Sequence, residues 1–91
     1  MASNDLVFTK NELGRYESTF VSSGEKVSIQ MERKTEDCYS VLCNVEGMDP
    51  VPVYTSGGTA RKNVIFTVDV PTGMEVTVVS MSEVVQAKIM K

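Results

Sequence analysis

The residues of this sequence that could carry out chemistry are few, and histidine is absent. Histidine is the commonest general base, the commonest metal ligand and the usual partner of a serine or cysteine nucleophile. An enzyme built on Cys43 would therefore lack its base, and we expect this cysteine to be a small apolar residue on the inner face of a strand. The residue types predict a protein without a catalytic apparatus.

The two cysteines, Cys38 and Cys43, lie in one predicted strand with an odd spacing, so their side chains point to opposite faces. Their Cα atoms would be about 16 Å apart, whereas a disulfide requires less than about 7 Å. We expect two free thiols, as in a reducing compartment. The spacing matches no zinc motif, and we expect neither a metal nor a cofactor.

Two carboxylates, Asp69 and Glu75, would lie nearly opposite each other if the turn Pro71-Thr72-Gly73 closes a hairpin. The pair is expected to be solvated, and whether it holds a cation stays open; calcium would need more oxygen ligands. The segment 56–62 is rich in glycine but lacks the spacing of a phosphate-binding loop, so we interpret it as a mobile loop.

Length, charge and hydropathy argue against further classes of protein. Ninety-one residues predict a single domain, 1–91, and the net charge of −3 argues against nucleic acid as a partner. The longest apolar runs are two or three residues, far short of the roughly 20 that span a membrane. The start, Met1 to Asp5, has no signal-peptide pattern, so we expect the chain to stay in the compartment where it is made.

Apolar residues alternate with polar ones along most of the chain, which is typical of half-buried strands. The clearest example is 26–32, where Val27, Ile29 and Met31 alternate with polar residues. This pattern predicts an all-β antiparallel sandwich or jelly-roll-like barrel of seven to eight short strands. The expected strands are 6–9, 15–22, 26–32, 38–46, 53–56, 62–70, 74–82 and 84–90.

Two of the expected connections have the properties of hairpin loops. The polar segment 33–37 would join 26–32 to 38–46 and place Met31 opposite Tyr39. The turn Pro71-Thr72-Gly73 would join 62–70 to 74–82 and place Phe66 opposite Val78. In both hairpins the apolar faces coincide.

Some apolar residues point away from this inner face. Ile65 and Val79 would lie opposite each other with Met81 beside them, and Leu42 has the same outward position on the first hairpin. Because the open face of a sheet should be polar, this pattern predicts contact with other protein subunits, as in a homo-oligomer or multi-copy assembly. The alternative is that loops or a differently assigned face cover these residues within the domain.

A carbohydrate-binding or adhesion module is the second hypothesis. Sandwich domains that bind sugars usually stack exposed aromatic rings on them. Trp is absent, and Tyr54, beside the prolines, is the one tyrosine expected to be available for such a contact.

The segment Phe66 to Gly73, followed by Val76 to Met81 and a last short strand, resembles the C-terminal part of small all-β accessory proteins of tailed-phage virions. The resemblance covers about a third of the chain, from residue 64 to residue 90. It implies a capsid-decorating or head-fibre-anchoring protein, located in the virion and present in many copies on a capsid-like shell.

Overall fold

The structure is a computed structural model that describes residues 3–90, which form two antiparallel sheets without helices. The strands are β1 (Ser3–Asp5), β2 (Thr9–Lys10), β3 (Tyr16–Val21), β4 (Lys26–Arg33), β5 (Tyr39–Asn44), β6 (Val51–Thr55), β7 (Asn63–Asp69), β8 (Glu75–Ser80) and β9 (Val84–Met90). Within these residues no helix is long and apolar enough to cross a membrane.

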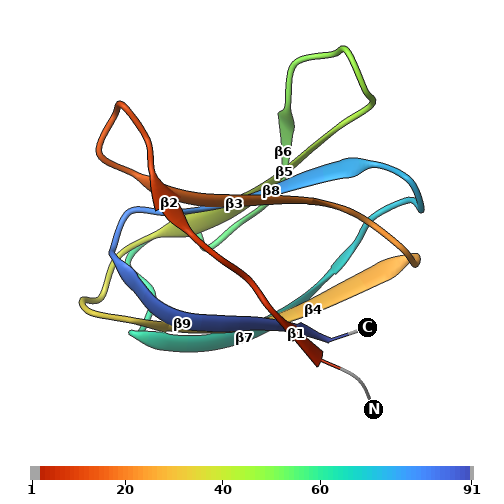
Figure 1. Ribbon diagram of the computed structural model, residues 1–91. Coiled ribbons are helices and arrows are strands. Elements are labelled where there is room, and N and C mark those ends of the chain that lie inside the picture. The colour runs from red at the N-terminus through yellow and green to blue at the C-terminus, as the bar shows by residue number, and fades with distance from the viewer. Residues whose placement is uncertain (1–2, 91) are drawn as a thin grey trace.

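The two sheets face each other as the layers of a sandwich (Figure 1). Sheet A has the strand order β1-β9-β4-β7, and sheet B has the order β2-β3-β8-β5-β6. When β2 and β3 are counted as one bent strand, successive strands alternate between the sheets except at β5 and β6, which are neighbours in sheet B. This strand order is that of a jelly roll. The predicted all-β sandwich is confirmed, and its sheets stay open rather than closing into a barrel.

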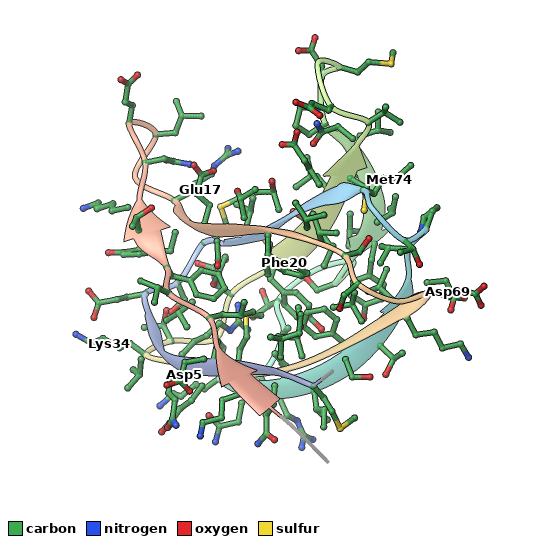
Figure 2. The ribbon with its side chains drawn as sticks, turned by 45° about the vertical axis from the view of Figure 1, so that its right-hand side comes forward. Asp5, Glu17, Phe20, Lys34, Asp69 and Met74 are labelled. Atoms are coloured by element: carbon green, nitrogen blue, oxygen red, sulfur yellow. The ribbon has the colours of Figure 1, made fainter. Side chains whose placement is uncertain are left out.

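The core lies between the layers and is made by alternate residues of every long strand. In β4, for example, Val27, Ile29 and Met31 are buried while Gln30 and Glu32 are exposed. Figure 2 shows side chains from both sheets filling this space, with Phe20 of β3 among them. The apolar residues buried here are Val27, Ile29, Met31, Tyr39, Val41, Cys43, Phe66, Val68, Val70, Val76, Val78, Ala87 and Ile89.

Both predicted hairpins are wrong, although the inward residues assigned to them are buried as expected. Strands β4 and β5 lie in different sheets, as do β7 and β8. Met31 pairs with Val64 rather than with Tyr39, and Val78 pairs with Val41 rather than with Phe66. The connections are arches, which join a strand of one layer to a strand of the other. An arch is as compatible with the alternation of apolar and polar residues as a hairpin is, because both place the same side chains toward the core.

The 70–74 arch is held by Ser22, a buried serine at the end of β3. Its hydroxyl donates to the Pro71 carbonyl, its carbonyl accepts from the Gly73 N–H at 2.9 Å, and its hydroxyl oxygen accepts from the Met74 N–H at 3.2 Å. Gly73 has φ of 87°, a conformation that glycine adopts without steric cost. The predicted turn therefore exists, but it connects the sheets.

Several strand boundaries differ from the prediction. The segment 6–9 is mostly a connection between β1 and β2, and β6 begins at Val51 and includes Pro52, which is tolerated because β6 is an edge strand. Alternation along 38–46 and 84–90 would place Val45 and Val85 on inner faces, but they are 55% and 58% exposed. For Val45 the reason is that β5 ends before it, and for Val85 that the register of β9 against β4 shifts at Glu32/Arg33.

A substitution inside the core tests the arrangement of the layers. Met31 is fully buried, so Met31→Ala should lower the free energy of unfolding by about 2–5 kcal/mol, through lost burial and the cavity left behind. Val85→Ala, on an exposed position of β9, should change it little. Urea unfolding followed by circular dichroism measures both, and equal effects would contradict the described core.

Candidate functional site

The four predicted interface residues do not form one patch. Ile65 is 75% exposed on the outer face of sheet A, where it pairs with Gln30. Val79 and Leu42 are half-buried diagonal neighbours on the outer face of sheet B. Met81 follows β8 and is also half-buried. The expected juxtaposition of Ile65 and Val79 is wrong because their strands belong to different sheets.

Tyr54 is not the free ring that sugar binding would need. Its ring stacks on Phe66 with centroids 5.5 Å apart and lies 5.9 Å from the Tyr39 ring. Its hydroxyl contacts the Tyr39 hydroxyl at 3.5 Å. All six aromatic residues lie within residues 3–90 and are buried or half-buried, so none is a fully exposed ring.

The expected pairing of Asp69 with Glu75 is also wrong. Asp69 ends β7 in sheet A and pairs with Lys26, whereas Glu75 begins β8 in sheet B between Val21 and Asn44. The two carboxylates therefore lie in different layers. Within residues 3–90 no group of three or more acidic, cysteine or histidine residues is placed to hold a metal ion.

The most apolar exposed surface lies on the hairpin of β5 and β6, which sequence reasoning did not identify. This hairpin projects from sheet B (Figure 1), and we call residues 43–53 the β5–β6 arm. Four apolar side chains of the arm stand in solvent, two of them on the connection between β5 and β6 and two on the edge strand β6. They are Val45 at 55% exposure, Met48 at 68%, Val51 at 62% and Val53 at 48%.

A groove of about 320 Å³ runs along the base of the arm. Val70, Pro71 and Met74 of the 70–74 arch form one wall, and the arm's apolar side chains form the other. Met74 is visible at the base of the arm in Figure 2. The spacing of Val51 and Val53 along β6 was the available signal, but the two prolines beside them suggested an irregular connection instead.

The charged residues at this groove are acidic. Asp49 and Asp69 line it, Glu46 lies exposed on the arm, and the lining includes neither lysine nor arginine. Surfaces that associate tend to have complementary potentials. The groove therefore fits an apolar projection bordered by lysine or arginine.

The outer face of sheet A has a different character. A depression of about 280 Å³ on it is lined mainly by amide and charged side chains. These are Gln30, Glu32, Asn63, Gln86 and Lys88. Exposed apolar side chains on this face include Ile65, beside Gln30 on the neighbouring strand, and Met90, beside Ser28.

Arg33 is an unexpected buried charge, since the sequence placed it in a polar loop. It is 2% exposed. Its guanidinium donates to the carbonyl of Arg61 at 2.6 Å, and at longer range to the carbonyls of Ala60 and Cys38 and to the Ser80 hydroxyl. It also lies 5.2 Å from the centre of the Tyr39 ring.

Carbonyl dipoles, rather than a carboxylate, therefore compensate this charge. Burial lowers the pKa of the Arg33 guanidinium from its usual value, while Tyr39 and Asp37 act in the opposite direction. The Nε atom of Arg33 has no hydrogen-bond partner. The side chain ties together the connections that follow β4 and β6 and the end of β8, so we assign it a structural role.

The buried thiol and phenol have shifted pKa values. Burial raises the pKa of the Cys43 thiol above its ordinary 9.0. Burial, followed by the hydrogen bond to Tyr54, raises the pKa of the Tyr39 hydroxyl above its ordinary 10.0. Both cysteines are free, and a thiol held in its protonated form is a poor nucleophile.

Comparison of the sequence with known proteins assigns no family to this chain. No family model matches the chain, and no curated protein shows a significant similarity to its sequence.

Removal of the buried cation should destabilise the fold. Arg33→Ala leaves a cavity and takes donors away from buried carbonyl groups, so the free energy of unfolding should fall by about 3 kcal/mol. Lys34→Ala is the matched control, because its ion pair with Glu83 is exposed and should contribute almost nothing. Urea titrations of both variants decide this, and an unchanged midpoint for Arg33→Ala would be the contrary result.

Stability should fall at alkaline pH. Because the pKa values of Cys43 and Tyr39 are raised in the folded state, the unfolded chain loses these protons first. The stabilisation is thus complete below about pH 9 and decreases as the pH rises further. Urea unfolding at about pH 8 and about pH 11 measures the loss, which should be smaller in Tyr39→Phe. An equal loss in both proteins would contradict the role of Tyr39.

Proposed function

We propose that this chain is a non-enzymatic assembly protein that packs on other protein subunits through the β5–β6 arm, as a capsid accessory or decoration protein of a virion. The observation that carries the proposal is the exposed apolar surface of the arm. Val45, Met48 and Val51 are each more than half exposed on a segment that projects from the sheet.

Exposed apolar side chains gathered in one place favour a protein-binding role. The core does not need these residues, because the inner faces of the two sheets already cover each other. The pairing of Cys43 with Val51 holds the base of the arm, and the Met48 N–H donates to the Val45 carbonyl at 2.9 Å across its turn. Such preorganisation reduces the entropy cost of binding.

The fold and the sequence resemblance support the same class of function. Jelly-roll sandwiches occur in viral capsid domains and also in lectins. Of these two, the capsid role suits the apolar arm, whereas the lectin role would benefit from an exposed aromatic ring, and Tyr54 is covered by Phe66. The resemblance of residues 64–90 to tailed-phage accessory proteins points to the virion as the location.

The acidic residues at the groove define the chemistry of the partner. An apolar projection would enter between the arm and the 70–74 arch, while lysine or arginine beside it would face Asp49 and Asp69. The occupant is therefore a shell subunit that presents an apolar ridge with a basic border.

Virions provide the direct test. The chain should be present in purified virions of the phage that encodes it, and the double variant Met48→Glu/Val51→Glu should be lost from them while its circular dichroism spectrum is unchanged. The control is Leu13→Glu, which alters a residue 75% exposed on the loop between β2 and β3. It should remain bound.

A photo-crosslinker attached at position 48 identifies the contact by mass spectrometry. It should join the chain to a shell subunit, at a site where apolar residues adjoin lysine or arginine. Absence of the wild-type chain from virions would refute the proposal, as would retention of the double variant.

A further inference from the structure

The free edge of β7 differs from the other three sheet edges. Natural proteins protect sheet edges with short strands, prolines, bulges or lysines, because an open edge invites pairing with another chain. Strands β1 and β2 have only 3 and 2 residues. Strand β6 contains Pro52 and has an irregular register against β5. Each of these three edges is protected.

Strand β7 has none of these protections. It is 7 residues long and contains neither proline nor lysine. Its pairing with β4 continues without a shift from Asp69 to Asn63, so the strand has no bulge against its neighbour. Its outward side chain with the largest apolar exposure is Ile65, at 75%.

The direction of its backbone groups follows from two hydrogen bonds at its ends. The Val70 N–H donates to the Glu25 carbonyl at 2.8 Å, and the Lys62 carbonyl accepts from the Arg33 N–H at 2.9 Å. Because backbone groups alternate in direction along a strand, even-numbered residues of β7 face β4. The N–H and C=O groups directed to the open edge belong to Asn63, Ile65, Thr67 and Asp69.

We propose that a second copy of the chain pairs antiparallel along this edge, about a two-fold axis at Ile65. A two-fold contact uses the same surface on both copies, so one self-complementary strand is sufficient. This inference rests on the proposed assembly function, because a second copy of the chain would be one of the subunits with which the protein assembles.

Side-chain complementarity selects this register. Ile65 would lie opposite the partner's Ile65, so that each copy covers an apolar side chain that is 75% exposed in the other. Asn63 would lie opposite the partner's Thr67, and Arg61, two residues before β7 begins, would lie near the partner's Asp69. Opposite charges placed across a strand pair stabilise it, and here each copy supplies both signs.

The neighbouring register is less favourable. An axis at Phe66 would place Ile65 opposite the partner's Thr67, and Arg61 would then lie toward the partner's Pro71 rather than its Asp69. The Ile65 register also brings half-buried Val64 beside the partner's Phe66 on the inner face. The two four-stranded sheets A would become one continuous sheet.

A contact made by one strand buries little area, so the dimer should be weak and concentration-dependent. Sedimentation velocity over a series reaching the millimolar range should show monomer converting to dimer. Thr67→Pro removes an N–H that faces the open edge and leaves the β4 pairing intact, so it should abolish the dimer without unfolding the domain. The control is Val85→Lys, a charge placed at an exposed position of β9, which should still dimerise.

Cross-linking tests the register. With Cys38→Ser as background, the thiols introduced by Ile65→Cys should face each other and form a disulfide on mild oxidation. Those introduced by Thr67→Cys should not, because Thr67 would face the partner's Asn63. Arg61→Glu and Asp69→Lys should each weaken dimerisation at least several-fold, and the combination should restore it.

A monomer at every concentration would overturn this inference, as would a dimer that survives Thr67→Pro. Binding to virions separates it from the proposed function. If wild-type chain binds virions as a monomer, the self-pairing fails and the assembly role stands. If it dimerises as described but is absent from virions, the assembly role fails and the self-pairing stands.

Discussion

Each of the two sheets has one apolar face, and within residues 3–90 the cover for that face is the other sheet. Val78 and Met31, from opposite layers, are both fully buried. The segments that project from the sandwich keep their positions only as long as the two layers stay packed together. The arm and the open edge of β7 are features of this kind, because neither contributes its exposed side chains to the core.

Sequence alternation predicted the inward residues and the strand class well, since the two-residue period depends only on local geometry. It could not predict which strands pair with each other, because the turn at Gly73 reverses the chain equally well within a sheet or between sheets. The burial of Arg33 could not be predicted from the sequence, because its hydrogen-bond acceptors come from segments distant along the chain. The arm was missed because the exposure of its side chains is a property of the assembled fold.

The exposed surfaces of the two sheets differ in chemical character. The arm of sheet B presents an apolar groove with Asp49 and Asp69, whereas the outer face of sheet A presents amides and mixed charges around Ile65. A protein with both contacts could use the groove for a large partner and the edge of β7 for its own copy at the same time. Asp69 borders the groove and also ends β7, so substitutions at Met48 or at Ile65, rather than at Asp69, should affect one contact without the other.

The arches have a kinetic consequence. Long strands such as β4 and β8 pair with strands distant in the chain, as in the pairings of Ile29 with Ile89 and of Phe20 with Val76. A chain dominated by such distant pairings must close large loops before contacts compensate the lost entropy, so it folds slowly, in about milliseconds to seconds. During that interval unpaired strand edges are available to neighbouring chains, and dilution during refolding should raise the yield of native protein.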